Sequence, residues 1–479
     1  MVNPFHLMPG PKVWPIFGCG LNYSKFGKYS FERLHLAKID YYKRYGNIYR
    51  ERLGPMWIVN LFSPDDMAKV FRAEGRYPNR PALPIVTAGH KHDGIRLGLG
   101  SLGGKEWHKL RTSITKIMMR PKAATLYLPA QNKVADDFVQ FLKESRNEKM
   151  QIPDFYNQIL KYTMESIGTV CFNTRLGTLS HDLKADSEAY KMVMGSAAMF
   201  DGVVRTTYAF PWYMLFRTKL YKQFKWGKET CEKIAQIYID KTLERLKNTN
   251  DGNEAHESEV TFLTTLLESG KVSKEEALDI TVDLFTAAID STASALSFAI
   301  YNLSKHPEKQ EKLYQEIKDV VGDGGDVTAD QLDKMHYLKA CIKESFRLNF
   351  PIEGGTRRIL EESLELGGYK VPKGTLIAMN AQTTCLMEEY FDKPFEYVPE
   401  RWMKDGSAEL NPPPAFTMMP FGYGPRMCVG RRFAEQEIYL ALMKMVGHFK
   451  LGYTGKGIGM LNRVFTMPDS PLTVTFTER

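Results

Sequence analysis

The spacing of apolar residues along the chain predicts a mainly helical protein with several short strands. Residues 48–71 contain two β-rich runs, separated by a turn at Gly54 and Pro55, and then a helix capped near Ser63. Between residues 123 and 246 apolar side chains recur mainly at spacings of three and four, the period of a helix with one buried face. Short β-like runs return in the last third of the chain. We therefore expect a mainly α fold with small β-sheets.

One helix is expected to be much longer than the others. Ser273 and Glu276 form a capping box, and the helical pattern that follows continues to about residue 304. A helix over residues 274–304 would measure about 45 Å at 1.5 Å per residue. Residues 284–303 are apolar enough to span a membrane but carry Asp290 at their middle. We therefore expect a buried core helix rather than a membrane span.

The composition is that of a soluble globular protein and limits the classes of partner. Of the 479 residues, 43% are hydrophobic and 25% are charged, so the chain can bury a large core. A net charge of +8 favours an acidic protein partner or an anionic membrane surface. Because no lysine-rich tract or nucleic-acid motif concentrates this charge, we expect no nucleic-acid partner.

Cysteine usage and the start of the chain bear on its compartment. The six cysteines are widely scattered and form no C-x-x-C pair, which favours a reducing compartment over a disulfide framework. The chain opens on MVNPFHLMPGP, which is neither a hydrophobic anchor nor an Arg- and Ser-rich presequence. We therefore expect any targeting segment to have been removed or truncated.

Residues 420–430, with the sequence PFGYGPRMCVG, hold the strongest candidate for chemistry, the thiol of Cys428. Glycines and Pro425 surround it with backbone that can bend sharply and approach a flat ligand. A helix is predicted just past Gly430, and its unpaired N–H groups favour thiolate, which binds soft or borderline metals. One cysteine without a nearby Cys or His cannot build a tetrahedral zinc site, so we expect a metal with other ligands from elsewhere, above all a heme. A buried structural cysteine is the alternative.

This loop resembles the heme-binding loop of the cytochromes P-450. The family pattern F-G-x-G-x-R-x-C-x-G is matched by Phe421, Gly422, Gly424, Arg426, Cys428 and Gly430. The resemblance implies a heme b cofactor with Cys428 as the axial ligand of its iron, Arg426 on a propionate, and Phe421 and Gly422 beside it. It extends from the proline-rich opening at residues 8–18 to the final strands. We therefore expect one cytochrome P-450 domain over residues 1–479, with the heme buried between the long helix and the 420–430 loop.

The resemblance also assigns donors to the heme propionates. Trp107 and Arg111 lie four positions apart and therefore share a helix face, which by itself often means only a surface cation–π pair. In the family this W-x-x-x-R pair sits on a propionate, and Arg358 matches a further propionate-binding arginine, with Arg357 as the second candidate. Burying an anionic cofactor requires several such donors, because an unpaired charge away from water is costly.

The long helix carries TAAIDST at residues 286–292, which resembles the oxygen-binding stretch of the family. By resemblance, Asp290, Ser291 and Thr292 are the catalytic residues of this stretch. An acid and a hydroxyl there could deliver protons to dioxygen, so that its O–O bond breaks with water as leaving group. Ala288 and Ser291 stand where many members have glycine and threonine. The alternative for Asp290 is a satisfied buried carboxylate.

A second family motif is structural. Glu344 and Arg347 are spaced to meet on one helix face, an arrangement that alone usually means a solvated ion pair. Together with the PERW stretch that contains Arg401, they resemble the buried Glu-Arg-Arg network of the family. We expect these three residues to lock the fold behind the heme.

Two basic residues of the same segment suggest an electron donor. Lys339 and Lys343 lie four apart, as in a solvated helix stripe. They fall where mitochondrial-type members dock a two-iron ferredoxin of the adrenodoxin type, which works with its reductase. Electrostatic complementarity of this kind gives fast, salt-sensitive encounter. Arg431 and Arg432 extend the same basic face.

Residues 208–226, from Tyr208 to Trp226, interleave aromatic side chains with arginine and lysine. One interpretation is an ordinary helix-loop-helix, and the other is a surface that dips into a membrane. The resemblance to the loop between the F and G helices of mitochondrial members favours peripheral membrane contact. A lipophilic substrate would then enter from the bilayer.

The resemblance as a whole implies a heme-thiolate monooxygenase that inserts one oxygen atom of O2 into a lipophilic molecule. The mitochondrial type, weakly closest to the vitamin D 24-hydroxylase branch, suggests a sterol, secosteroid or steroid as substrate. It implies the matrix side of the mitochondrial inner membrane, with the endoplasmic reticulum and a truncated anchor as the alternative. Alternative functions are a broad xenobiotic monooxygenase, a heme-thiolate isomerase or dehydratase, and a non-catalytic heme protein.

Overall fold

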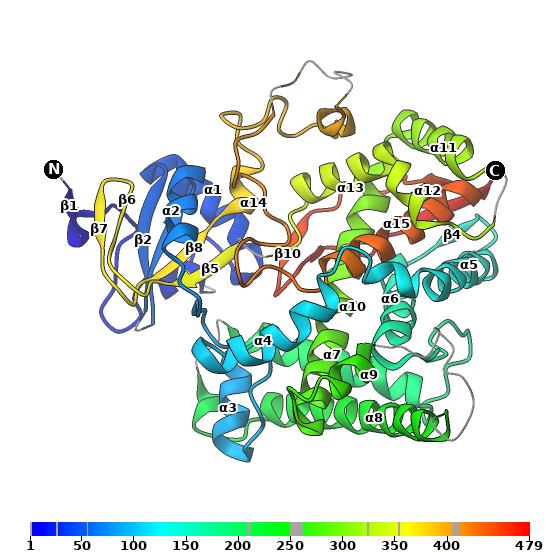
Figure 1. Ribbon diagram of the computed structural model, residues 1–479. Coiled ribbons are helices and arrows are strands. Elements are labelled where there is room, and N and C mark those ends of the chain that lie inside the picture. The colour runs from blue at the N-terminus through cyan, green and yellow to red at the C-terminus, as the bar shows by residue number, and fades with distance from the viewer. Residues whose placement is uncertain are drawn as a thin grey trace.

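The computed structural model describes residues 2–24, 27–54, 56–207, 211–249, 262–322, 325–352, 355–404, 410 and 412–479. Figure 1 shows a small part rich in strands, which holds the N-terminus, beside a larger helical part through which α10 runs. The helices are α1 Leu34–Tyr45, α2 Pro64–Ala73, α3 Pro84–Asp93, α4 Gly104–Met118, α5 Leu128–Ser145, α6 Phe155–Phe172, α7 Glu188–Thr207, α8 Lys219–Thr249, α9 Phe262–Glu268, α10 Lys274–Lys305, α11 Pro307–Val321, α12 Ala329–Lys334, α13 His336–Leu348, α14 Ala381–Thr384 and α15 Arg431–His448. The expectation of a mainly helical fold is therefore confirmed.

The described strands form four small sheets. They are β1 Asn3–Pro4, β2 Ile48–Leu53, β3 Met56–Leu61, β4 Gln151–Ile152, β5 Thr356–Ile359, β6 Leu364–Leu366, β7 Tyr369–Val371, β8 Leu376–Met379, β9 Phe449–Gly452, β10 Met460–Asn462, β11 Thr466–Pro468 and β12 Val474–Glu478. The largest sheet has the order β2-β3-β8-β5, in which β3 and β8 are parallel and the other pairs are antiparallel. The β4-β12-β9 sheet pairs the end of the chain with the strand before α6, with Val474 opposite Ile152.

The helix starts expected from short sequence signals are present. Ser63 accepts a hydrogen bond from the N–H of Asp66 at the start of α2. Ser273 and Glu276 form the reciprocal capping box of α10. Helix α8 continues to Thr249.

Helix α10 crosses the boundary between the two largest hydrophobic clusters. Its N-terminal half contributes Phe285 and Ile289 to a cluster with α4, α6, α8 and α9. Its C-terminal half contributes Leu296 and Phe298 to a cluster with α5, α6, α13 and α15. The helix is long and apolar enough to cross a membrane, but 72% of its apolar window is buried inside the protein, as expected of a core helix. Asp290 therefore lies between two packed clusters.

Asp93, at the end of α3, bonds this helix to the start of α8 and to the segment just before α8. The carboxylate accepts a hydrogen bond from Tyr221 Oη and forms ion pairs with Arg217 and Lys225, both at 3.1 Å. His92 Nε2 lies 2.8 Å from the carbonyl oxygen of Tyr213. The Tyr221 hydrogen bond, followed by that of Arg217, lowers the pKa of Asp93. The fastening therefore depends on an ionised carboxylate.

Candidate functional site

The 420–430 loop is bent by glycines at two positions that require them. Gly422 has a φ of 70° and Gly424 a φ of 75°, a region that side chains disfavour. A Cβ at Gly424 would also lie 2.9 Å from Glu74 Oε2. The turn is closed by a hydrogen bond of 2.8 Å from the N–H of Cys428 to the carbonyl of Phe421. The loop thus holds the cysteine at a fixed point just before α15.

Cys428 differs from the other cysteines in its accessibility. The other five cysteines are buried, whereas Cys428 is exposed. Burial nevertheless raises the pKa of its thiol, while a hydrogen bond from the Gly430 N–H and the charge of Arg111 act in the opposite direction. The side chain of Cys428 is therefore accessible although protein surrounds it on most sides. A cation or metal at the sulfur would favour the thiolate.

Arg426 points a free donor into this region. Its Nε donates to the carbonyl of Pro78 at 3.1 Å and its Nη2 to that of Leu102 at 2.6 Å. The guanidinium lies 4.1 Å from the centroid of the Trp107 ring. Its Nη1 is buried without a hydrogen-bond partner among the described residues. An unsatisfied buried cationic donor is costly and therefore indicates a place prepared for an anionic acceptor.

Three further arginines surround Arg426. Burial, and then the charges of Arg80, Arg358 and Arg111, lower the pKa of Arg426 to about 9. Burial also lowers the pKa of Arg111 to about 10, and its Nη2 donates to the carbonyl of Met427 at 2.7 Å. Guanidinium groups this close repel one another in a buried setting. The cluster therefore carries an uncompensated positive charge.

The nearby carboxyls offset only part of the charge of the cluster. Glu74 is bonded to Arg358, and its Oε2 is buried without a partner among the described residues. Burial, and then the charge of Arg358, lower the pKa of Arg80, and Asp283 acts in the opposite direction. Burial raises the pKa of both Glu74 and Asp283, which favours their neutral forms.

A heme fits these residues. Its two propionates supply the anionic acceptors that the arginine cluster lacks, and its iron accepts the thiolate of Cys428. Among the described residues there is no group of three or more His, Cys, Asp or Glu that could hold a metal ion by itself. When bound, the heme supplies the oxygen-activating chemistry of the site.

The stretch of α10 around Asp290 is partly accessible. Ala287 is exposed although the helix lies in the core, and Ala288, Asp290 and Ser291 are half-buried. Ser291 Oγ donates back to the carbonyl of Ala287 at 2.7 Å. The hydroxyl of Thr292 is buried and has no partner among the described residues. An acid and two hydroxyls thus follow one another on this stretch of α10. Asp290 and Ser291 are half-buried, whereas the hydroxyl of Thr292 is buried.

Asp290 is poised to change its charge near neutral pH. Burial raises the pKa of its carboxyl to about 7, and a hydrogen bond from Tyr156 limits the rise. The phenol of Tyr156, on α6, lies 3.5 Å from Asp290 Oδ1. A carboxyl with this pKa can both hold and release a proton at physiological pH.

Two contacts differ from those that nearby positions in the sequence would suggest. Trp107 and Arg111 are both buried on α4, but the cation over the Trp107 ring is Arg426 rather than Arg111. Arg358 is bonded to Glu74 and, through Nη2, to the carbonyl of Tyr423 at 3.3 Å. Both differences arise because the partners come from distant segments, which helical spacing does not reveal.

Sequence reasoning missed Arg80 and Tyr156. Arg80 donates twice to the carbonyl of Gly100, at 3.1 and 2.5 Å, from an irregular segment between two prolines. No periodicity marks such a residue. The only available signal was that a buried dianionic cofactor needs more than two arginines.

The structure brings Glu344, Arg347 and Arg401 together in the core. Arg347 donates to both oxygens of Glu344, at 2.9 and 2.8 Å, and Arg401 Nε donates to Oε1 at 3.1 Å. Trp402 Nε1 and the N–H of Val398 complete the set at 2.8 and 3.0 Å. The side chains of Glu344 and Arg347 are 0% exposed. A solvated ion pair, the alternative from sequence, is thereby ruled out.

The two lysines of α13 have different surroundings. Lys339 Nζ donates to the carbonyl of Asp333 at 3.0 Å and lies 3.4 Å from its carboxylate. Lys343 lies 4.3 Å from the centroid of the Trp402 ring and has no ion-pair partner within the described ranges. Arg431 is close enough to lower the pKa of Lys343, after the larger effect of burial. Lys343 is therefore the less compensated of the two charges.

The segment before α8 exposes apolar side chains. Trp212, Leu215 and Phe216 are 55%, 62% and 62% exposed. They lie in the 3-10 turn Trp212–Met214 or directly after it. Residues 208–210 of the predicted membrane-contacting stretch lie outside the described residues.

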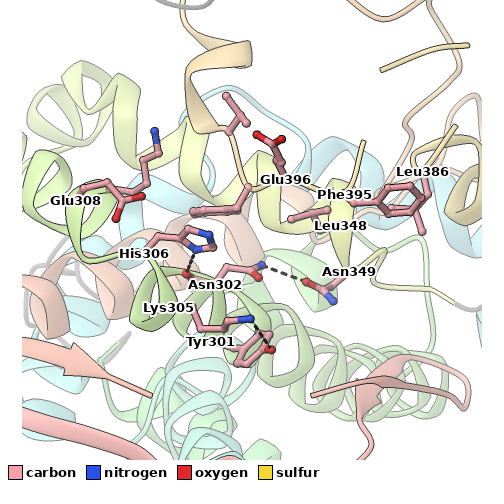
Figure 2. A pocket seen from close by; sticks show the side chains of 13 residues that line it. Tyr301, Asn302, Lys305, His306, Glu308, Leu348, Asn349, Leu386, Phe395 and Glu396 are labelled. Atoms are coloured by element: carbon pink, nitrogen blue, oxygen red, sulfur yellow. Dashed lines mark hydrogen bonds between the residues drawn. The ribbon is translucent and has the colours of Figure 1, made fainter. Parts of the chain in front are cut away.

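A surface pocket of about 650 Å³ lies elsewhere, at the C-terminal end of α10 (Figure 2). Asn302 Nδ2 donates to Asn349 Oδ1 at 3.1 Å, and Lys305 Nζ donates to Tyr301 Oη at 3.4 Å, so polar groups that line it are bonded to one another. Its lining includes no residue of the 420–430 loop. The charge and the open sulfur place the candidate active site at Cys428 instead.

The sequence is similar to those of known proteins over the length of the chain. A family model described as Cytochrome P450 matches residues 8–476. Cytochrome P450 10 of Lymnaea stagnalis is 32% identical over 480 residues, which are 100% of this chain and 86% of that protein. The mitochondrial 1,25-dihydroxyvitamin D(3) 24-hydroxylase of Rattus norvegicus is 31% identical over 473 residues, or 98% and 89%. Probable cytochrome P450 301a1, mitochondrial, of Drosophila melanogaster is 30% identical over 490 residues, or 99% and 87%.

Proposed function

Because the chain belongs to the cytochrome P450 family and is therefore a heme-thiolate monooxygenase, we propose that it hydroxylates a sterol, secosteroid or steroid with electrons from a mitochondrial two-iron ferredoxin. The observation that carries the proposal is the similarity, over 98% of the chain, to a relative whose name states hydroxylation of a secosteroid in the mitochondrion. The similarity to a second relative named as mitochondrial supports the compartment.

Each residue of the site takes a role in this proposal. Cys428 is the thiolate ligand of the iron, with Phe421 and Gly422 beside the cofactor. The donors to the propionates are Arg426, Arg111, Trp107 and Arg358. Asp290 holds a proton and passes it on, while Ser291 and Thr292 supply hydroxyls. The uncompensated charge of the arginine cluster and the raised pKa of Asp290 support these roles.

The basic side of α13 and the start of α15 is the proposed docking surface for an adrenodoxin-type ferredoxin. Lys343 lacks a carboxylate partner within the described ranges, and Arg431 and Arg432 are exposed nearby. Arg431 pairs with Glu435 at 2.9 Å, on the surface, where such a pair is readily exchanged for a partner's carboxylate. An acidic partner would be drawn to this face at a rate that falls with salt.

The proposed membrane contact uses the exposed side chains of Trp212, Leu215 and Phe216. Aromatic rings settle at the headgroup level, and the lysines of early α8 suit anionic lipid. The matrix face of the mitochondrial inner membrane is the proposed location, and the endoplasmic reticulum is the alternative. A lipophilic substrate would reach the cavity from that bilayer.

A Soret titration of the purified ferric holoenzyme tests the substrate class. Sterols, secosteroids and ecdysteroids are compared with unrelated drug-like hydrophobes. We expect a saturable shift from low to high spin at low micromolar concentration with one sterol class, followed by hydroxylation of that compound when ferredoxin and its reductase are added. Weak shifts with varied hydrophobes and none with sterols would favour a broad xenobiotic monooxygenase. Turnover of a lipid peroxide without any electron donor would favour an isomerase or dehydratase.

A further inference from the structure

The start of α6 is held rigidly beside α10. The ring of Phe155, the first residue of α6, is 0% exposed and packs edge-on against Phe476 with centroids 4.9 Å apart. The N–H of Phe155 donates to the carbonyl of Leu472 at 2.8 Å. These contacts with the C-terminal strand leave the next residue, Tyr156, little freedom to move. Its phenol is therefore placed by packing rather than by its own hydrogen bonds.

The phenol of Tyr156 lies between two positions of α10. Its oxygen is 3.5 Å from Asp290 Oδ1 and 3.4 Å from Ser294 Oγ. Ser294 is 0% exposed and follows Asp290 by one helical turn. These distances are long for hydrogen bonds, and catalytic hydrogen bonds commonly tighten only when a ligand is bound. Tyr156 is also the one side chain in the described part of the chain that is bonded to the Asp290 carboxyl.

We propose that Tyr156 is a positioning residue for Asp290, whose phenol holds the carboxyl in one orientation toward the cavity and shares its hydrogen bond with Ser294. When Asp290 is ionised, Tyr156 donates to Oδ1. When Asp290 is protonated, the carboxyl donates to Tyr156 Oη, which turns its own hydrogen toward Ser294. One hydrogen thus lies between the two oxygens in either state, the proton gained or lost by the carboxyl is exchanged with the surroundings, and no bond other than O–H is formed or broken.

The charges around the pair are consistent with this role. Burial raises the pKa of Asp290, and Tyr156 is the group that lowers it. Burial, and then the charge of Asp290, raise the pKa of the Tyr156 phenol, and Arg463, between β10 and β11, is the cation that acts in the opposite direction. Because Tyr156 favours the ionised form of the carboxyl, its loss should raise the pKa of Asp290 further. This inference does not depend on the substrate or the electron donor proposed above.

The test is infrared spectroscopy of the resting ferric holoenzyme between pH 5 and 9, which needs no turnover. The C=O stretch of the protonated carboxyl is assigned by its loss in Asp290→Asn. We expect a midpoint near pH 7 in the wild type and a rise of about one pH unit in Tyr156→Phe, which corresponds to the loss of a single weak hydrogen bond to a charge. In Ser294→Ala the phenol loses the acceptor to which it donates when Asp290 is protonated. The protonated form is then less favoured, so the midpoint should fall.

Tyr162→Phe is the matched control. Tyr162 lies on the same helix, is 0% exposed and donates to the carbonyl of Glu437 at 2.9 Å, so its variant also loses one buried hydroxyl. We expect no shift of the Asp290 midpoint in this variant and a parallel shift of the pH profile of turnover in Tyr156→Phe. Equal midpoints in the wild type, Tyr156→Phe and Ser294→Ala would overturn the proposal. If Tyr156→Phe does not fold, the sign of the Ser294→Ala shift decides, and a rise or no change refutes it.

Discussion

The substitution Glu344→Gln tests how much of the fold rests on one buried carboxylate. Glu344 accepts hydrogen bonds from Arg347, Arg401, Trp402 and the Val398 N–H. A glutamine of the same shape keeps one acceptor oxygen but loses the charge. Two guanidinium groups, 0% and 1% exposed, would then remain buried without a counter-charge.

The expected loss is large for a single substitution. Breaking a buried ion pair by removing one partner costs about 3–5 kcal/mol, against a total folding stability of about 5–15 kcal/mol. With an unfolding entropy of about 2.1 cal/mol/K per residue, a chain of 479 residues has about 1 kcal/mol/K in all. A loss of about 4 kcal/mol therefore lowers Tm by about 4 °C.

The measurement is denaturant and thermal unfolding of the holoenzyme, followed by circular dichroism and the Soret band. Glu400→Gln is the control, because Glu400 lies beside Arg401 on the 3-10 turn Pro399–Trp402 and pairs with Lys309 and Lys312 at 3.1 and 3.2 Å nearer the surface. We expect that control to lose about 1 kcal/mol. If Glu344→Gln loses no more than Glu400→Gln, the charge of Glu344 does not stabilise the fold as argued.

Three further predictions follow from the charges of the molecule. Arg426→Gln removes a cation worth about 1.5–3 kcal/mol in a charge-assisted hydrogen bond, so heme transfer to an acceptor apoprotein should be at least roughly tenfold faster. An unchanged rate would contradict the role of the arginine cluster in holding the heme. Lys343→Glu should raise the KM for an adrenodoxin-type ferredoxin about tenfold at low salt. Lys339→Glu should change it less, because Lys339 is already bonded to Asp333, and equal effects would argue against this surface. Since Tyr221 and Arg217 hold the pKa of Asp93 below its unfolded value of about 3.9, its contribution to stability is complete above that pH and is lost as the pH falls further. The protection factors of α3 amides, which are corrected for the pH dependence of intrinsic exchange, should therefore fall near pH 3 in the wild type and already be low at pH 7 in Asp93→Asn, and high protection in the variant would refute the fastening.

Local features of the fold could be predicted because their causes are local. The caps at Ser63 and Ser273 depend on residues three positions away, and both are present. The long helix could be placed because its apolar run, its cap and its final proline lie within one stretch. The loop of Cys428 could be recognised because its glycines are adjacent to the sulfur in sequence.

The rest of the site could not be predicted because its contacts join distant segments. Arg426 bonds to the carbonyls of Pro78 and Leu102, which precede it by most of the chain. Tyr156 meets Asp290 only because α6 packs along α10. Helical spacing puts Trp107 and Arg111 on one face, but it cannot tell which cation will stack on the indole. Pairing of this kind is decided by tertiary packing.

The pairing of β12 with β4 joins two segments that are made far apart in time during synthesis. Strand β12 occupies Val474–Glu478, at the very end of the chain, and Val474 lies opposite Ile152. The β4-β12-β9 sheet therefore cannot form until the segment between Ile152 and Val474, about two thirds of the polypeptide, has been made. Closing so long a loop makes folding slow. Until then the apolar surface that will cover Phe476 stays open, and such surfaces are where chaperones bind and aggregation begins. A nascent chain that ended before Val474 would already contain Cys428, but it would lack the strand that fixes the start of α6.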